Sequence, residues 1–133
     1  MSYEPKLKKI DNDLFIYSVL RDKYIRFSHE EYVRQWVVNL YIQKYNVPKN
    51  LISEEKKIKG SKKRYDLLIY NKELKPAILV EIKAPGVRIS ESAVSQALGY
   101  AHKLGVKIIV VTNGKEFLAY NIEKGIFLEE PFY

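Results

Sequence analysis

The chain has 133 residues, a length that suits one compact domain, and 47% of them are hydrophobic, well above the range of disordered proteins. It contains no cysteine, which excludes disulfides and thiolate zinc sites and favours a reducing cytoplasm. The net charge of +7 is compatible with a polyanionic partner such as nucleic acid. The longest apolar run, residues 108–111, is far too short to cross a bilayer, so no membrane partner is expected.

The first part of the chain predicts a short strand followed by a helix. Residues 1–12 are polar and are expected to be poorly ordered, whereas residues 14–20 are rich in strand formers and are expected to form a short strand or an arm packed on the core. Ser28 and Glu31 have the spacing of a capping box, which marks a helix start. Apolar residues then recur at helical intervals, and the helix is expected to end near Tyr45, since Pro48 cannot continue it.

The middle of the chain predicts three strands. Residues 51–59 and 64–70 flank the turn-like sequence Lys59-Gly60-Ser61, which suggests a hairpin. A second turn at residues 71–73 leads to residues 76–83, whose nearly continuous apolar run predicts a strand buried on both faces.

The last part predicts a second helix and a second hairpin. Residues 91–104 carry an apolar stripe, and Gly105 follows as the expected end of that helix. Residues 107–112 predict a buried strand, and Asn113-Gly114 is a strong turn signal before a returning strand over residues 116–121. We therefore expect one α/β domain over residues 1–133, with a central mixed β-sheet flanked by helices.

Three charged residues fall at the ends of predicted buried strands, where an unpaired charge is costly. Glu81 and Lys83 end the most apolar strand, and their spacing places both side chains on one face of the sheet. Asp66 begins the neighbouring strand, so a hairpin would bring its carboxylate near that of Glu81. Mg²⁺ accepts one or two carboxylates together with water and phosphate oxygens. The triplet indicates metal-assisted phosphodiester hydrolysis; the alternative is a buried Lys83–Glu81 ion pair, with Asp66 as a turn residue.

The sequence around the triplet resembles a known family. Residues 64–69 (RYDLLI) and 78–86 (ILVEIKAPG) are similar to the core of PD-(D/E)XK nucleases, in particular the N-terminal nuclease domain of type I restriction enzyme R subunits. Upstream, residues 31–35 (EYVRQ) resemble the acidic motif of that family's first helix. Downstream, residues 95–101 (SQALGYA) match its Gln-x-x-x-Tyr motif, and residues 112–114 (TNG) are also typical. Tyr65 stands where the superfamily often has proline.

The resemblance implies a restriction-endonuclease-like fold and a metal site. It makes Asp66 and Glu81 ligands of Mg²⁺, for which Mn²⁺ can substitute, with the Ile82 carbonyl as an additional ligand. Lys83 would orient or activate the attacking water. The cofactor implied is therefore a hard divalent cation.

The resemblance also implies supporting residues on both predicted helices. Glu31 would complete the acidic site from the first helix, although helical periodicity does not choose between Glu30 and Glu31. Gln96 and Tyr100 would support the site from the second helix, where a spacing of four puts them on one face. A structural explanation is also open for these residues: Glu31 as a capping-box residue, and Gln96 and Tyr100 as half-buried packing residues.

A basic run precedes Asp66 and supplies candidate DNA contacts. Six Lys or Arg residues fall between residues 56 and 64. Lys62, Lys63 and Arg64, together with Tyr100, are the expected DNA-binding residues, although a Lys-rich stretch is more often a solvated hairpin.

Three functions are consistent with the sequence. The first is a Mg²⁺-dependent endonuclease that cleaves DNA in a restriction or related defence system. The second is a non-catalytic module that binds nucleic acid or protein, and the third is a repair or RNA-directed nuclease of the same superfamily. The chain has no Walker A pattern, so translocation would require a helicase partner. Methylase and specificity subunits are further expected partners, and a homodimer would supply one active site for each DNA strand.

Overall fold

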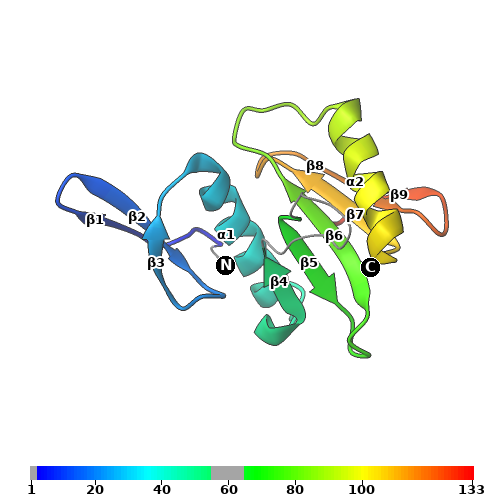
Figure 1. Ribbon diagram of the computed structural model, residues 1–133, viewed down its shortest axis with the longest axis horizontal. Helices are drawn as coiled ribbons and strands as arrows, with labels where there is room; N and C mark the ends of the chain where they lie inside the picture. Colours follow the sequence, from blue (N-terminus) through cyan, green and yellow to red (C-terminus); the bar gives the residue numbers. More distant parts are fainter. Residues whose placement is uncertain (1–2, 55–64) are drawn as a thin grey trace.

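The computed structural model describes residues 3–54 and 65–133. In this part of the chain, a three-stranded sheet and a six-stranded sheet are joined by helix α1 (His29–Gln43), and α2 (Glu91–Leu104) covers the larger sheet (Figure 1). The expected mixed sheet flanked by helices is confirmed. Neither of these helices is long and apolar enough to cross a membrane.

The small sheet is formed by the N-terminal residues. Its antiparallel strands are β1 (Leu7–Ile10), β2 (Asp13–Ser18) and β3 (Lys23–Arg26). The expectation of poor order over residues 1–12 is wrong for β1, which pairs with β2 although its four residues are exposed. On β2, Ile16 and Ser18 are fully buried, and this strand contacts α1.

Helix α1 begins as the capping pattern predicts. The Ser28 hydroxyl accepts the backbone N–H of Glu31 at 3.0 Å. The Glu31 carboxylate, which a complete capping box would turn back to Ser28, lies instead against Arg34 and Gln35. A short 3₁₀ helix, η1 (Lys49–Leu51), follows and leads into the large sheet.

The large sheet has six strands in sequence order. They are β4 (Ile52–Glu54), β5 (Leu67–Tyr70), β6 (Pro76–Ile82), β7 (Ile108–Thr112), β8 (Phe117–Asn121) and β9 (Ile126–Leu128). Strands β6 and β7 are parallel because α2 crosses between them, and the other pairs are antiparallel. The predicted pairing of β4 with β5 is confirmed, whereas the predicted turn Lys59-Gly60-Ser61 lies outside the described residues.

A hydrophobic core lies on each face of this sheet. Ile78, Val80 and Ile82 of β6 point toward the core that includes α1, and Leu79 points toward the core beneath α2. Strand β6 is therefore buried on both faces, as its apolar run predicts. The helix end at Gly105 is also confirmed, since this residue has the left-handed φ of 74°.

The Asn113-Gly114 turn brings the β7–β8 hairpin against α1. Gly114 has a φ of 90°, and a Cβ at this position would meet a Val33 methyl at 3.3 Å. Both its backbone conformation and this close approach favour glycine.

Candidate active site

Asp66 and Glu81 lie opposite each other at one end of the β5–β6 hairpin. Leu67 pairs with Val80, and one more step along both strands places Asp66 beside Glu81. Glu81 shares a face of the sheet with Leu79, because side chains alternate along a strand. The predicted hairpin therefore brings the two carboxyl groups together.

Asp66 is held by donors on both of its oxygens. Its Oδ2 accepts the backbone N–H of Ile82 at 2.7 Å, which fixes the side chain against the end of β6. Its Oδ1 lies 3.3 Å from Nη2 of Arg34, a residue of α1 that is 5% exposed. The carboxylate is thus oriented by one strand and one helix.

Glu81 is a buried carboxyl group, only 7% exposed. The pKa of Glu81 is raised to about 8, mainly by burial and also by the charge of Asp66 and a hydrogen bond with its carboxyl group, while Lys83 acts in the opposite direction. Its Oε1 is buried without a hydrogen-bond partner among the described residues. A buried carboxyl oxygen in this position is suited to a proton or a cation.

Lys83 follows directly after β6 and is anchored through its backbone. Its N–H donates to the Thr112 carbonyl at 2.8 Å, which continues the pairing with β7. The adjoining loop is tied to the next hairpin, since Asn113 donates from Nδ2 to the carbonyl of Val87 at 2.8 Å. The Lys83 side chain is half-buried and close enough to Glu81 to affect its pKa.

The two neighbouring glutamates of α1 have different surroundings. Both oxygens of Glu31 are occupied, Oε1 by Arg34 at 2.6 Å and Oε2 by Gln35 at 2.9 Å. The Glu30 side chain is 49% exposed and lies 3.7 Å from Arg34. Burial raises the pKa of Glu30, and the charge of Asp66 raises it further, while Arg34 and Lys83 lower it. The pKa of the Glu30 carboxyl group is thus affected by the charges of both Asp66 and Lys83.

Two of the remaining predicted site residues lie on α2. Gln96 and Tyr100 are half-buried on α2, and Gln96 donates to the Tyr100 hydroxyl at 3.1 Å. Lys62, Lys63 and Arg64 lie outside the described residues. The sequence presents Arg34 only as part of the motif at residues 31–35, because nothing in its spacing predicts that it reaches Asp66.

The donor set is compatible with Mg²⁺. Asp66 and Glu81 present two carboxyl groups, and Glu81 Oε1 has no protein partner in the described ranges. Within those ranges no three His, Cys, Asp or Glu side chains gather closely enough to hold a metal by themselves. Mg²⁺ does not need a third, since it retains waters and takes phosphate oxygens from its substrate.

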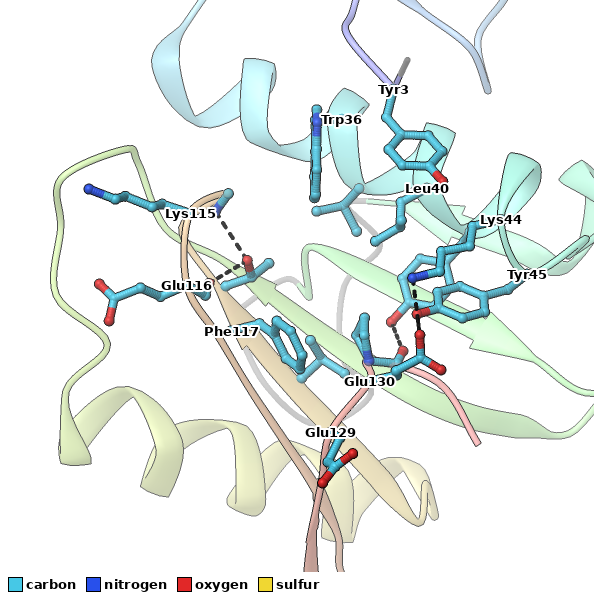
Figure 2. Close-up of a pocket in the computed structure, with 16 residues that line it drawn as sticks. Tyr3, Trp36, Leu40, Lys44, Tyr45, Lys115, Glu116, Phe117, Glu129 and Glu130 are labelled. Atoms are coloured by element: carbon cyan, nitrogen blue, oxygen red, sulfur yellow. Dashed lines mark hydrogen bonds and ion pairs between the residues drawn. The ribbon is translucent and has the colours of Figure 1, made fainter. Parts of the chain in front are cut away.

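A separate pocket of about 350 Å³ lies between α1 and the β7–β8 hairpin. Figure 2 shows Trp36, Leu40 and Phe117 around it, with Lys44 and Glu130 paired at one side. Neither Asp66 nor Glu81 lines this pocket. Its lining is mostly apolar and offers no comparable cluster of buried carboxyl groups.

The fold and the carboxyl cluster together define a mixed α/β domain of restriction-endonuclease-like architecture, with an acidic site where two central strands end. The chain belongs to the family described as "Type I restriction enzyme R protein N terminus", whose model matches residues 29–129.

A solved structure supports the fold assignment. It is a fragment assigned to an HsdR subunit of a type I restriction enzyme from Vibrio vulnificus YJ016, with a TM-score of 0.61 and 24% sequence identity. The match covers 80% of this chain and 23% of that longer chain. Among curated proteins, none matches the sequence. Strands β1 to β3 precede the part of the chain that the family model matches.

Proposed function

We propose that this domain is a Mg²⁺-dependent endonuclease that hydrolyses phosphodiester bonds of DNA in a restriction system. The observation that carries the proposal is the pair Asp66–Glu81, two carboxyl groups in contact at the end of buried strands, one of them with a raised pKa. Such a pair is costly in a purely structural role. Membership of the restriction enzyme family favours DNA as the substrate.

Each residue of the cluster has a role in the proposed reaction. Asp66 and Glu81 would hold Mg²⁺, with the Ile82 carbonyl as an additional ligand. Bound there, the ion supplies Lewis-acid polarisation of a phosphate oxygen and eases deprotonation of water. Lys83 would orient the attacking water and stabilise the negative charge that develops on the phosphate.

Glu30, rather than Glu31, is our candidate for the helix carboxylate of the site. Its side chain is half exposed, and the charges of Asp66 and Lys83 affect its pKa. Both oxygens of Glu31, by contrast, are hydrogen-bonded within α1. Glu30 would accept a proton or bind water at the entrance. Gln96 and Tyr100 would contact the substrate from α2.

The domain would work with other components. The related HsdR fragment is a longer chain, of which this domain corresponds to 23%. We expect methylase, specificity and helicase components to supply sequence recognition and translocation, and the DNA substrate implies a cytoplasmic location. A homodimer would place one site on each strand.

A plasmid-cleavage assay tests the proposal. Purified protein should nick or linearise supercoiled plasmid with Mg²⁺ or Mn²⁺ and should be inactive with EDTA. Asp66→Asn, and the double variant Glu81→Ala with Lys83→Ala, should each lose cleavage by about 100-fold or more. Glu129→Gln, an exposed carboxylate of the separate pocket, is the matched control and should cleave normally.

The assay also separates the enzyme from a binding module. Equal nicking by wild type and both site variants would contradict catalysis at this site. Binding of plasmid without any metal-dependent cleavage would support the non-catalytic alternative instead.

A further inference from the structure

Arg34 is a buried cation that joins helix α1 to the proposed metal ligand. It is 5% exposed, with Nη1 at 2.6 Å from Glu31 Oε1 and Nη2 at 3.3 Å from Asp66 Oδ1. Asp66 turns its other oxygen to the Ile82 N–H at 2.7 Å. The Arg34 guanidinium and the Ile82 backbone amide thus each donate a hydrogen bond to a different oxygen of the Asp66 carboxylate.

Arg34 is itself held by a chain of hydrogen bonds within the fold. Gln35, which is fully buried, donates to Glu31 Oε2 at 2.9 Å and accepts the Val19 N–H at 3.0 Å. Glu31 is therefore fixed on one side by Gln35 and on the other by Arg34. A continuous series of contacts runs from the end of β2 through α1 to Asp66.

The charges in this network do not balance. One guanidinium lies within 4 Å of three carboxylates, at 2.6 Å from Glu31, 3.3 Å from Asp66 and 3.7 Å from Glu30. An apolar replacement of a buried ion pair is often as stable, so stability alone does not explain the arrangement. A metal ligand, by contrast, must be held in place by hydrogen bonds from the surrounding residues.

We infer that Arg34 is a positioning residue for Asp66, with Glu31 and Gln35 holding Arg34 in turn. The inference rests on the proposed function, because it takes Asp66 as a ligand of Mg²⁺. It assigns Glu31 to the support of the site rather than to the metal.

Calorimetric titration with Mg²⁺ tests this role, because charge and positioning predict opposite signs. Removing a nearby cation would tighten Mg²⁺ binding if Arg34 were only a counter-charge. If Arg34 positions Asp66, both Arg34→Met and Arg34→Lys should weaken Mg²⁺ binding by about 10- to 100-fold. Lys44→Met, which removes an exposed cation paired with Glu130, is the matched control and should leave binding unchanged.

Two further measurements distinguish loss of positioning from a failure of the variant to fold. If Arg34→Met fails to fold, Glu31→Gln combined with Arg34→Met removes both buried charges and should still bind Mg²⁺ at least about tenfold more weakly. Excess Mg²⁺ should restore plasmid cleavage by Arg34→Lys, which a purely structural defect would not allow.

The outcomes separate this inference from the proposed function. Wild-type protein that binds Mg²⁺, with binding lost in Asp66→Asn but unchanged or tighter in both Arg34 variants, would overturn the positioning role alone. Wild-type protein that binds no Mg²⁺ would overturn both.

A second inference comes from the N-terminal sheet, which lies outside the part of the chain matched by the family model. Three cation–ring pairs lie within residues 6–26, whereas about one pair per 70–80 residues is usual. They are Lys6 over Tyr17 at 5.8 Å, Lys8 over Tyr24 at 5.3 Å, and Arg26 over Phe15 at 5.8 Å.

The strand register places all three pairs on one face of this sheet. Phe15 faces both Lys8 and Arg26 across the neighbouring strands, and Tyr17 faces Tyr24. The intervening residue Ile16 is buried on the opposite face. The face therefore presents three cations over a row of rings and two opposing carboxylates: Asp13, paired to Arg26 at 3.3 Å, and Asp22, which accepts a hydrogen bond from the Tyr17 hydroxyl.

The geometry points to this face as a contact surface for the phosphodiester backbone of DNA. Lysine and arginine neutralise phosphates, and a ring beneath each cation restricts its motion. The surface is independent of catalysis, because none of its residues belongs to the carboxyl cluster.

Fluorescence anisotropy with a labelled DNA duplex in EDTA tests this surface. Lys6→Gln combined with Lys8→Gln should weaken binding by about tenfold and reduce the slope of log affinity against log salt by about 1.8. Lys72→Gln combined with Lys75→Gln changes net charge equally at the exposed β5–β6 turn and is the control. Equal affinities of the two variants, or no binding by wild type, would overturn the inference.

Discussion

Charged or polar side chains lie on helix α1 itself and at its C-cap residue Lys44, with very different surroundings. Toward the carboxyl cluster, Glu31, Arg34 and Gln35 are 8%, 5% and 0% exposed and bond to one another. Toward the apolar pocket of Figure 2, Lys44 pairs with Glu130 at 3.0 Å, and these side chains are 47% and 59% exposed. The charged side chains at the pocket are exposed to water, whereas Glu31 and Arg34 beside the cluster are buried.

This difference in burial is our reason for placing the proposed active site on the side of the carboxyl cluster. An exposed ion pair contributes little and can be exchanged freely. A buried group of carboxylates with a single guanidinium is costly, and its cost is explained if a cation completes it. Size and apolar character would have favoured the pocket as a ligand site, but burial of charge favours the cluster.

The largest difference between the two sides should be seen when a lysine is removed from each. Lys83→Met should lower plasmid cleavage by about 100-fold or more, because in the proposed reaction this ammonium would act on the water and the phosphate. Its Mg²⁺ affinity, measured by calorimetry, should be unchanged or tighter. Lys44→Met at the pocket should leave both quantities unchanged, and an equal loss of cleavage in both variants would contradict the distinction.

The next largest difference is expected in the free energy of unfolding, when the cation on each side is replaced. Arg34→Met leaves Glu31 buried without its cation and should lower the free energy of unfolding by about 3–5 kcal/mol. Urea denaturation monitored by circular dichroism measures this, and Lys44→Met should unfold like wild type. Adding Glu31→Gln to Arg34→Met should recover part of the loss. No recovery would argue that the guanidinium acts through packing alone.

The raised pKa of Glu81 should make the free energy of unfolding depend on pH. Its pKa is raised from 4.5 to about 8, so the folded protein retains a proton that the unfolded chain has lost between these values. The contribution of Glu81 to the stability of the metal-free protein is therefore fully present below pH 4.5 and decreases as the pH rises toward 8, by at most about 1.4 kcal/mol per pH unit. Glu81→Gln should flatten this decline, whereas Glu130→Gln should preserve it. A decline unchanged in Glu81→Gln would assign it to other groups.

The smallest effect is expected in the apolar pocket. Phe117 is 43% exposed at its edge, so Phe117→Ala should change the free energy of unfolding by only about 0.5 kcal/mol. Cleavage and Mg²⁺ affinity should be unaltered. A loss of cleavage without a loss of stability would show that this pocket takes part in the reaction.

Most of the large sheet was predictable from the sequence, but its last strand, β9, and strands β1 and β3 of the small sheet were not. The buried run of β6 and the Asn113-Gly114 turn carry strong local signals, and both were found where expected. Strand β3 has one half-buried residue, Ile25, among exposed ones, so it offers no periodic pattern. Strands β1 and β9 are similarly short and exposed, and only their pairing partners reveal them.

The site was predictable in its strands and only partly in its helices. Asp66 and Glu81 are brought together by a hairpin whose register follows from local sequence. The choice between Glu30 and Glu31 depends on how α1 is rotated against the sheet, which helical periodicity left open. The contact between Arg34 and Asp66 joins residues 32 positions apart and required the tertiary structure.

Crystallography with Mn²⁺ is the most direct test of the central claim, that Asp66 and Glu81 hold a divalent cation. Crystals grown or soaked with MnCl₂ should show an anomalous peak bonded to both carboxylates and to the Ile82 carbonyl, and the peak should be absent from Glu81→Gln crystals. A well-ordered carboxyl pair that still shares a proton, with no anomalous peak at saturating Mn²⁺, would contradict the account.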